Sequence, residues 1–489
     1  MHSSDRKRKS EKPVANGNKR LRSSPSVVLH SYSKLPTVND TPERKTQPLD
    51  LFVWGTGSMS ELGLGPAAST KEVKRPRLNP YLTKEALGGE NIVDFAVGGM
   101  HTLAVDTKNR VWSWGSNDNG VLGRDTSHAK EAVKDIEEES EDEDADLNEA
   151  ESTPNLVENL PSNGHNIIQL AATDNLSAVL YDNGDVYAWG CFRNNEGLLG
   201  FLKDKIKLQK TPLKIDQLKN IVQLAGGKDH LLALDSKGVV YGWGNSQQFQ
   251  LGRKVLDRHR YRELEPKPFG LYGIKYIASG DYHCYAISHD DEVYVWGLNQ
   301  YGQCAITGSQ GELEDGSLIT KPTLLLQLKG KKVIQLAAGE HHSLALLENG
   351  EVYAWGRYDM KEVGIPESSL PEDTYRDSHS KPRSVPTPTK LQFVSKSGNT
   401  KCKYVGCGSH HSFAITDDGM VYAWGFADTY ATGLGPLDSD VERPTRIVNT
   451  ATKFHDIHIV GGGGQFSVSG GVKIEDHSEG EKRLKKYDD

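Results

Sequence analysis

The sequence predicts an all-β fold, a seven-bladed β-propeller spanning residues 50 to 472, and three observations support this prediction. Tryptophan–glycine pairs recur through the span, a Gly-x-x-His segment precedes most of them at a constant distance, and glycine supplies 50 of the 489 residues. Proteins usually contain about 7% glycine, so this excess indicates many tight turns rather than long helices. Repeats of roughly 50 residues are typical of propellers.

The first landmark, Trp-Gly, includes seven of the eight tryptophans. Successive pairs are separated by 60, 75, 54, 53, 59 and 69 residues, which indicates one repeated unit with insertions of variable length. The pairs begin at Trp54, Trp114, Trp189, Trp243, Trp296, Trp355 and Trp424.

The second landmark, Gly-x-x-His, places its histidine thirteen residues before the tryptophan, and the second repeat keeps this spacing with Leu176 in place of the histidine. Between the landmarks lie two stretches of alternating apolar residues with a turn between them. The turns include Asn183-Gly184, Asn349-Gly350 and Asp418-Gly419. Because these dipeptides favour type I′ turns, each repeat is expected to contain an antiparallel hairpin. The landmark segments begin at Gly98, Gly227, Gly280, Gly339 and Gly408.

Two half-repeats at the ends of the span complete each other. Trp54 has no Gly-x-x-His before it, and the segment Gly463 to Val468 has no Trp-Gly after it. Pairing of the N- and C-terminal strands would close the ring and remove the two free sheet edges.

The repeated residues are interpreted as structural. Each tryptophan is expected to pack between blades, and the following glycine to allow a turn where a Cβ would clash. The histidines are expected to be hydrogen-bonded elements of their blades, because histidines spread around a ring do not converge on one metal ion.

Charge is arranged in blocks outside the repeats. Asp135 to Glu151 holds eleven acidic residues and no basic one, whereas residues 1 to 24 carry eight Lys or Arg against Asp5 and Glu11. We expect a disordered basic arm over 1–49, an acidic insertion at about 130–152 and a charged tail over 473–489. Two clusters in the arm resemble a bipartite nuclear-import signal, although these cations could also neutralise DNA phosphates or have no partner. They comprise Arg6, Lys7, Arg8, Lys9, Lys19, Arg20 and Arg22.

Composition and motifs argue against several classes of protein. The five cysteines are odd in number and include no Cys-x-x-Cys pair, which favours a reducing compartment. No apolar run reaches the ~18 residues of a membrane span, and no secretory signal is present. Phosphate-binding loops, nucleophile elbows, zinc-binding helices and calcium-binding loops are also missing from the sequence. We therefore expect a binding platform without cofactor, metal or covalent chemistry.

One loop departs from the repeat. The tryptophan and the closing glycine are nine residues apart at Gly63, Gly123, Gly252, Gly364 and Gly433, and Ala305 holds that place in a sixth repeat. Trp189 and Gly200 are eleven apart, so this loop is two residues longer and is a candidate binding element. A neutral surface insertion is the alternative. Polar residues at Asp174, Asp229, Arg253 and His341 would lie on one rim if the turns share a face, and an ordinary solvated rim is the alternative there.

These repeats resemble the regulator of chromosome condensation family over residues 50 to 472. Three segments are similar to its branch of guanine-nucleotide exchange factors for the GTPase Ran: Gly98 to Thr102, Leu122 to Ser127 and the loop that begins Phe192-Arg193. The acidic insertion and Lys71 to Pro76 suggest a fungal member.

The resemblance implies that one propeller face binds Ran. Phe192, Arg193, Asn194, Asn195, Glu196 and Gly197 correspond to the family's wedge against the phosphate-binding region of the GTPase. Asp174, Asp229, Arg253, His341 and His101 fall where the family places GTPase-contacting or exchange-supporting residues. Ser58 replaces a frequent acidic residue and Phe466 a frequent repeat histidine, so contacts near the ring closure are expected to differ.

The resemblance also implies a nuclear protein docked on nucleosomes, with the arm bound by an import receptor. Chromatin contact is expected from the arm and from a basic loop on the opposite face. In that loop Arg258, Arg260 and Arg262 would share one side if the chain is extended. The alternative is a chromatin-binding or adaptor propeller without exchange activity; an enzyme with covalent chemistry would need a polar pocket that the sequence does not reveal.

Overall fold

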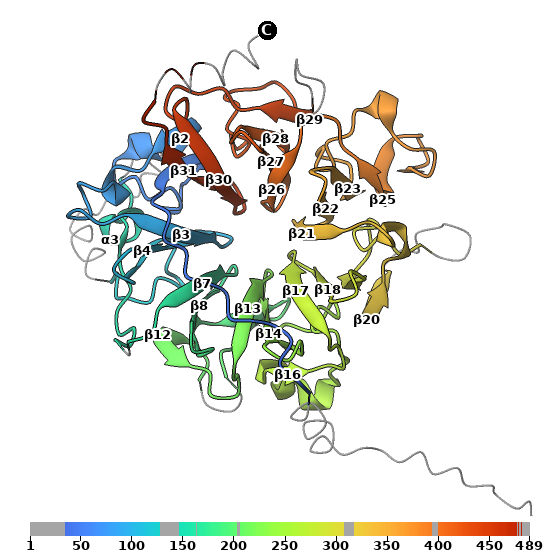
Figure 1. Cartoon of the computed structure of the whole chain (residues 1–489), viewed down its shortest axis with the longest axis horizontal. Coiled ribbons are helices and arrows are strands. Elements are labelled where there is room, and N and C mark those ends of the chain that lie inside the picture. Colours follow the sequence, from blue (N-terminus) through green and yellow to red (C-terminus); the bar gives the residue numbers. More distant parts are fainter. Residues whose placement is uncertain are drawn as a thin grey trace, which may run out of the picture. The chain divides into compact units, whose positions relative to one another are not determined.

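A computed structural model describes residues 35–127, 146–162, 164–202, 206–307, 317–393, 400–476, 478 and 481. The predicted import signal, at residues 6 to 22, and most of the acidic insertion lie outside these ranges. The chain divides into Met1–Pro36 and Thr37–Asp489, and the second unit contains all the described sheets. They form a ring of seven blades, which confirms the predicted propeller (Figure 1). No helix among the described residues is long and apolar enough to cross a membrane.

Each blade is an antiparallel sheet whose first strand lies at the centre of the ring (Figure 1). Blades 1 to 3 comprise β3 (Ile92–Val97), β4 (His101–Asp106), β5 (Val111–Gly115) and β6 (Asn155–Leu156); β7 (Ile167–Ala172), β8 (Leu176–Tyr181), β9 (Val186–Gly190) and β12 (Gln209–Lys214); and β13 (Ile221–Gly226), β14 (His230–Asp235), β15 (Val240–Gly244) and β16 (Lys267–Pro268). Blades 4 to 6 comprise β17 (Ile274–Ser279), β18 (His283–Ser288), β19 (Val293–Leu298) and β20 (Leu318–Leu324); β21 (Val333–Ala338), β22 (His342–Leu347), β23 (Val352–Arg357), β25 (Pro382–Lys390) and β24 (Tyr375–Arg376); and β26 (Cys402–Cys407), β27 (His411–Thr416), β28 (Val421–Gly425) and β29 (Val441–Arg446).

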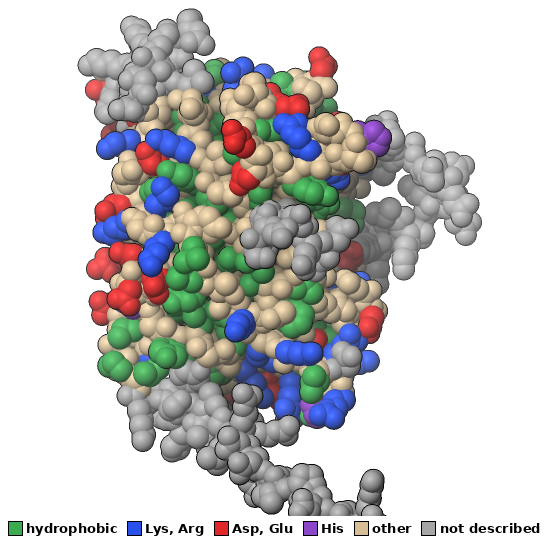
Figure 2. All heavy atoms as spheres, turned by 90° about the vertical axis from the view of Figure 1, so that its right-hand side faces the viewer, with side chains coloured by type: hydrophobic (Ala, Val, Ile, Leu, Met, Phe, Trp, Pro, Cys, Tyr) green, Lys and Arg blue, Asp and Glu red, His purple; other side chains and the backbone are tan. Residues whose placement is uncertain are grey.

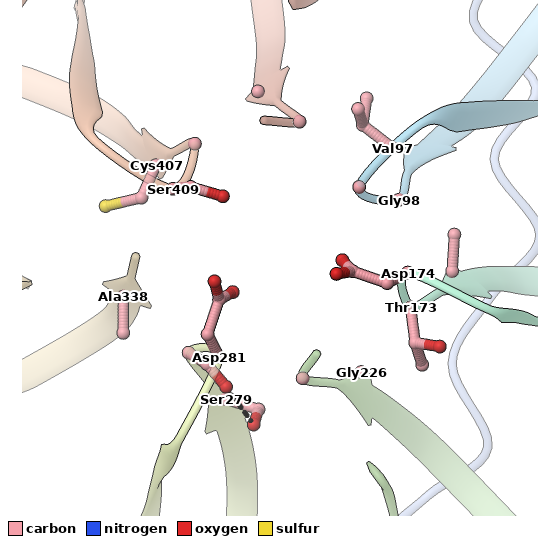
Figure 3. A pocket seen from close by; sticks show the side chains of 17 residues that line it. Val97, Gly98, Thr173, Asp174, Gly226, Ser279, Asp281, Ala338, Cys407 and Ser409 are labelled. Carbon is pink, nitrogen blue, oxygen red and sulfur yellow. Dashed lines mark hydrogen bonds between the residues drawn. The ribbon is translucent and has the colours of Figure 1, made fainter. Parts of the chain in front are cut away.

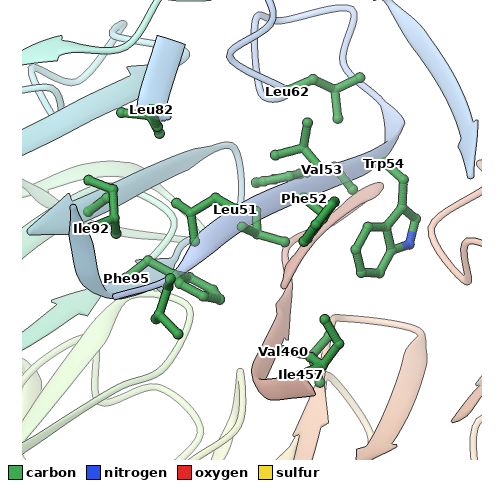
Figure 4. Close-up of a cluster of buried hydrophobic side chains, with 14 of the residues drawn as sticks. Leu51, Phe52, Val53, Trp54, Leu62, Leu82, Ile92, Phe95, Ile457 and Val460 are labelled. Carbon is green, nitrogen blue, oxygen red and sulfur yellow. The ribbon is translucent and has the colours of Figure 1, made fainter. Parts of the chain in front are cut away.

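Blade 7 closes the ring as predicted. It combines β30 (His455–Gly462) and β31 (Phe466–Lys473) with β1 (Asp50–Thr56) and β2 (Glu72–Leu78). The join between β1 and β31 runs in continuous antiparallel register from Asp50↔Gly471 to Gly55↔Phe466. Side chains of β1 and β30 pack in one apolar cluster beside it (Figure 4). Since β31 ends at Lys473, the propeller extends one residue beyond the predicted boundary.

The hairpin turns differ from the predicted type I′. In the turn after β8, Gly184 N–H donates to Tyr181 O, and only Gly184 has positive φ, at 79°; Asn183 is not among the positive-φ residues. Gly350 and Gly419 make the equivalent bonds. This is a type I turn followed by a left-handed glycine, which accommodates one more residue than a two-residue loop. The hairpin prediction is confirmed, but its turn type is wrong.

The tryptophans seal the contacts between blades, as predicted. All seven are at most 1% exposed. Six donate from Nε1 to a loop carbonyl of the preceding blade: Trp54 to Ala431, Trp114 to Glu61, Trp189 to Val121, Trp296 to Gln250, Trp355 to Gln303 and Trp424 to Glu362. Trp243 follows the blade with the long loop and packs edge to face on Phe192.

The histidines link neighbouring blades. His101 Nε2 lies 2.8 Å from Ser177 Oγ of the next blade, and the same pairing joins His283 to Ser343, His342 to Ser412 and His411 to Ser467. Ser177 Oγ donates to Val121 O, so His101 Nε2 must be the donor in its own bond. Burial lowers the pKa of His101 to about 3 and keeps the ring neutral. The predicted structural role is therefore confirmed.

Two contacts between blades lack the histidine. In both, the histidine and the serine of the neighbouring blade are replaced together. Where Leu176 stands in place of histidine, Leu231 stands in place of the serine, and both are fully buried in one apolar cluster. Where Phe466 stands in place of histidine, its neighbour is Thr102, whose buried Oγ1 has no hydrogen-bond partner among the described residues. The Phe466 substitution therefore alters a buried contact rather than a binding surface.

The ring has two faces. The turns between the first and second strands, together with the loops after each Trp-Gly, form what we call the loop face. The hairpin turns form the opposite face, and residues 37 to 49, here called the strap, run across it (Figure 1). Asn39 Nδ2 donates to Ile274 O at 2.8 Å, and Lys45 Nζ lies 2.7 Å from Asp94 Oδ1. The predicted arm boundary at 49 is therefore wrong, because the last 13 residues are fixed to blades 1 to 4.

We expect the strap to stabilise the ring. A chain that starts at residue 50 should have a free energy of unfolding about 2–4 kcal/mol below that of a chain that starts at residue 36. Several hydrogen bonds of about 0.5–1.5 kcal/mol each are lost, partly offset by the entropy that the strap regains. Urea unfolding followed by tryptophan fluorescence measures this difference. Equal midpoints for the two chains would show that the strap contributes nothing.

The end of the acidic insertion is ordered. Residues 146 to 152 include the short helix α3 (Glu149–Ser152), which is capped by the Asn148 side chain. Leu147 N–H donates to Pro66 O, and the buried Arg124 donates to Ala150 O. The insertion therefore rejoins the propeller earlier than the predicted boundary at 152.

Candidate functional site

The centre of the loop face is a ring of polar turns. Successive turns are joined by backbone hydrogen bonds, for example from Asp174 N–H to Lys228 O and from Lys228 N–H to Asp281 O. They surround a cavity of about 180 Å³ with many glycines in its wall. The Asp174 and Asp281 side chains point toward its interior from neighbouring sides (Figure 3).

These turns concentrate acidic groups around one lysine. Lys228 Nζ lies 3.9 Å from Asp174 Oδ2. Burial, and then the Asp281 carboxylate, raise the pKa of Asp174 to about 8, although Lys228 opposes the shift. Burial also raises the pKa of Asp281 to about 6. Since a basic group would lower both values, this centre favours a cationic partner surface.

The long loop forms a hairpin of its own, β10 (Phe192–Asn194) and β11 (Gly197–Gly200). Its root is fixed, because Phe192 is fully buried and Arg193 N–H donates to Asp229 Oδ1 at 3.1 Å. Asn175 Nδ2 donates to the same oxygen at 3.0 Å. Phe192 therefore anchors the loop from inside, and the accessible part begins at Arg193.

The tip of this hairpin presents mixed chemistry to solvent. Arg193, Asn195 and Glu196 are exposed, and Asn195 N–H is held by Gln247 Oε1 at 3.1 Å. Leu198, which was not among the predicted site residues, is 48% exposed. Only its position directly after Gly197, the glycine of the hairpin, could have indicated it.

Arg253 does not project from the loop face. Its Nη2 donates to Arg262 O at 3.0 Å and also contacts Gly242 O and Glu265 O. Arg124 holds the same place in blade 1 and binds backbone carbonyls in the same way. In this structure the Arg253 guanidinium fixes the following loop, and its predicted role toward a partner stays a prediction.

That loop contains the basic residues expected to bind chromatin, and its geometry corrects two expectations. Residues Asp257–Leu264 form the 3₁₀ helix η3 rather than an extended chain, so residues two apart face different directions. Arg260 Nη1 lies 2.5 Å from Glu196 Oε2, which places the loop beside the hairpin and not on the opposite face. Arg258 and Arg262 are exposed. Lys and Arg side chains gather at the lower end of the molecule in Figure 2, where Figure 1 places β16.

His341 lies at the rim of the same face among aromatic rings. Tyr282 stacks on it with centroids 5.9 Å apart, and Tyr301 lies at 5.0 Å. Burial, followed by the charge of Arg357, lowers the pKa of His341 to about 3. His410 occupies the equivalent position in the next blade, with Glu340 Oε2 at 3.4 Å from its Nδ1. Neither His410 nor Arg357 was predicted from the sequence. Arg357 left a signal, because it is the charged residue directly after Trp-Gly where the other repeats have uncharged ones.

His101 is separated from these residues, because its side chain is fully buried between blades 1 and 2. Its burial leaves a supporting role, through the packing of blades 1 and 2, as the form in which this prediction stands. Ser58, in contrast, is exposed and lines a second cavity of about 420 Å³ together with Met59 and Met100. Within the described ranges, no group of three or more His, Cys, Asp or Glu residues is arranged to hold a metal ion.

We expect His101→Ala to act on stability. The variant loses one buried hydrogen bond and leaves a void, so the free energy of unfolding should fall by about 2–4 kcal/mol. Chemical denaturation measures this, and His101→Gln, which retains an N–H donor, serves as the milder control. Unchanged stability together with weakened partner binding would contradict the buried role.

Comparisons with known proteins agree with this architecture. The family model described as "RCC1-like domain" matches residues 50–469. The chain is 64% identical over 469 residues to Protein RCC1 of Candida albicans, covering 94% of this chain and 99% of that protein. It is 57% identical to the guanine nucleotide exchange factor SRM1 of Saccharomyces cerevisiae, covering 91% of each.

Two solved structures are similar over nearly the whole chain. The crystal structure of Prp20p from Saccharomyces cerevisiae, described with its binding properties to Gsp1p and histones, superposes with a TM-score of 0.81 at 52% identity and covers 93% of this chain and 97% of that one. Yeast RCC1 (Prp20) bound to Kap60 superposes with a TM-score of 0.84 at 51% identity and covers 98% and 100%.

Proposed function

The chain belongs to the family that carries the RCC1-like domain, and we propose that it is a guanine-nucleotide exchange factor for the GTPase Ran. The observation that carries this proposal is the anchored hairpin of residues 192 to 200, the one loop that exceeds its siblings by two residues, beside an acidic ring of turns. Its relatives include the exchange factor SRM1 and a Prp20p whose binding to Gsp1p and histones has been described.

The reaction needs no covalent step. An exchange factor lowers the affinity of the GTPase for its nucleotide. By linkage, the nucleotide lowers the affinity of the GTPase for the exchange factor by the same ratio. The hairpin is the wedge that binds best when the phosphate site of Ran is distorted, so it stabilises the nucleotide-free complex. The more abundant nucleotide then displaces the factor.

The rigidity of the wedge suits this role. Phe192 is buried against Trp243, and Asp229 holds the Arg193 N–H, so the hairpin presses on the GTPase without first being ordered. The acidic centre around Asp174 and Asp281 complements basic residues on the partner. His341 lies at the rim of the loop face. His101 and Arg253 contribute indirectly, because His101 joins two blades and Arg253 fixes the loop that follows it.

We assign the protein to the nucleus, docked on chromatin, where it supports nucleocytoplasmic transport and the mitotic functions of Ran. An import receptor would bind the basic arm, as suggested by a relative solved with Kap60. Arg258, Arg260 and Arg262 remain candidates for contact with nucleosomes. Unchanged nucleosome binding after all three become alanine would remove them from this role.

The experiment that tests the proposal measures release of a fluorescent GDP analogue from Ran with substoichiometric amounts of this protein. Acceleration with turnover is expected. No acceleration by protein whose folding is confirmed would overturn the exchange function and favour a chromatin-binding or adaptor propeller.

A further inference from the structure

A buried cluster of charged and polar groups joins blades 5 and 6 on the loop face. Arg357, at the end of β23, is 8% exposed and donates from Nη2 to His410 Nδ1 at 2.8 Å. Its Nε binds the fully buried Glu362, and its Nη1 lies 3.8 Å from Glu340 Oε2. The guanidinium is thus held by two carboxylates and delivers one hydrogen bond to a histidine.

The preceding blade performs the same task with different residues. His341 and His410 occupy one repeat position, as do Leu298 and Arg357, and Gln303 and Glu362. Gln303 Nε2 lies 3.3 Å from His341 Nδ1. In both cases a side chain from the loop of one blade therefore donates to Nδ1 of the histidine on the next blade: Gln303 to His341, and Arg357 to His410. Blade 4 is uncharged at both positions, whereas in blade 5 Arg357 together with Glu362 takes the place of the neutral amide of Gln303.

A donor on Nδ1 determines what the histidine offers to a partner. If Nδ1 accepts, the proton of the neutral ring is on Nε2. His410 borders the cavity of about 420 Å³, together with Met100 and Phe426. Phe426 also contacts the ring edge to face at 6.4 Å.

We infer that Arg357 is a positioning residue for nucleotide exchange: it fixes the ring of His410 with the proton on Nε2, so that His410 offers an N–H donor to the GTPase at the rim of this cavity. The inference rests on the proposed function. Glu340 and Lys228 also face His410 from the neighbouring turns, and they act on its pKa in opposite directions. Burial, with Arg357 and Lys228, keeps that pKa below its ordinary value despite Glu340.

The test uses two double variants that both remove the buried charges. Arg357→Leu with Glu362→Gln copies the Leu298 and Gln303 of blade 4 and retains an amide that can donate to His410. Arg357→Leu with Glu362→Met has similar volume and no donor. Arg357→Leu alone is avoided as a probe, because it leaves a buried carboxylate unpaired. Melting temperatures establish that both double variants are folded.

We expect the glutamine variant to recover most of the Ran-GDP release rate and the methionine variant to be about fivefold slower, the factor of one ordinary hydrogen bond. In a His410→Ala background the two should exchange at equal rates. Equal rates with His410 present, or a difference that persists without it, would overturn the inference.

A second readout does not depend on exchange. Nitrogen-15 spectra of labelled histidine should show His410 protonated on Nε2 in the wild type and the glutamine variant, and a mixture of tautomers in the methionine variant. A wild-type His410 protonated on Nδ1 would refute the positioning role. If the spectra show the expected tautomers but the wild-type protein does not accelerate GDP release from Ran, Arg357 still positions His410 and the proposed exchange function is wrong.

Discussion

Deleting Asn195 and Glu196, which gives the wedge the length of its sibling loops, is expected to lower the rate of GDP release from Ran by about 30- to 150-fold. The deletion removes the hairpin tip, the Asn195 bond to Gln247 and the Glu196 pair with Arg260. Two to three interactions of about 1 kcal/mol each, made to the distorted GTPase, correspond to a loss of this size. Stopped-flow fluorescence of a labelled GDP measures it.

A length-preserving variant is the control for this deletion. Asn195→Ser with Glu196→Ser keeps the hairpin and should retain most of the activity, because shape rather than the two side chains displaces the phosphate site. Both proteins should melt near the wild-type temperature, since Phe192 and Gly200 at the root are unchanged. A shortened wedge with wild-type exchange would exclude the hairpin as the exchange element.

Asp229→Ala is expected to slow exchange by about ten- to 100-fold. Its carboxylate accepts from Arg193 N–H and Asn175 Nδ2 at the root of the wedge, and a hydrogen bond to a charged group contributes about 1.5–3 kcal/mol. Without it the hairpin must be ordered during binding, so the rate at saturating Ran should fall as well as the apparent affinity. Titration of Ran in the release assay separates these two effects.

Asp235→Ala is the matched control for Asp229→Ala. Asp235 lies five residues after His230 on the same strand, and it also accepts backbone N–H groups, from Lys237 and Val239, but on the opposite face. It should reduce stability without a comparable effect on exchange. If both variants slow exchange equally, the effect of Asp229 reflects general loss of stability and not the wedge.

The fold could be predicted from the sequence more completely than the contacts of the site residues. Strand alternation, the Asn-Gly turns and the Trp-Gly spacing follow from steric rules that act over a few residues, so seven blades and their closure could be predicted. The extra length of the loop after Trp189 was visible for the same reason. Even so, the turn type was wrong, because one additional residue in the loop moves positive φ from both central residues to the glycine alone.

The directions of the side chains needed the tertiary structure. Arg253 was expected to contact a partner, and its guanidinium binds carbonyls of its own blade. Arg260 forms an ion pair with Glu196 of the neighbouring blade. Neither contact leaves a periodic signal, since each joins residues whose separation depends on how insertions fold. The strap was not predicted for a related reason: its residues bind backbone carbonyls of blades 1, 3 and 4, which are distant in sequence.

The sequence by itself therefore determined the ring, its closure and the loop that departs from it, because side-chain alternation and turn chemistry act over a few residues and recur in each repeat. Only the tertiary structure decided that His101 is buried, that Leu176 is matched by Leu231, and that Arg357 binds His410. These are contacts between blades, and their partners are chosen by the packing of surfaces that the chain brings together only when the ring closes.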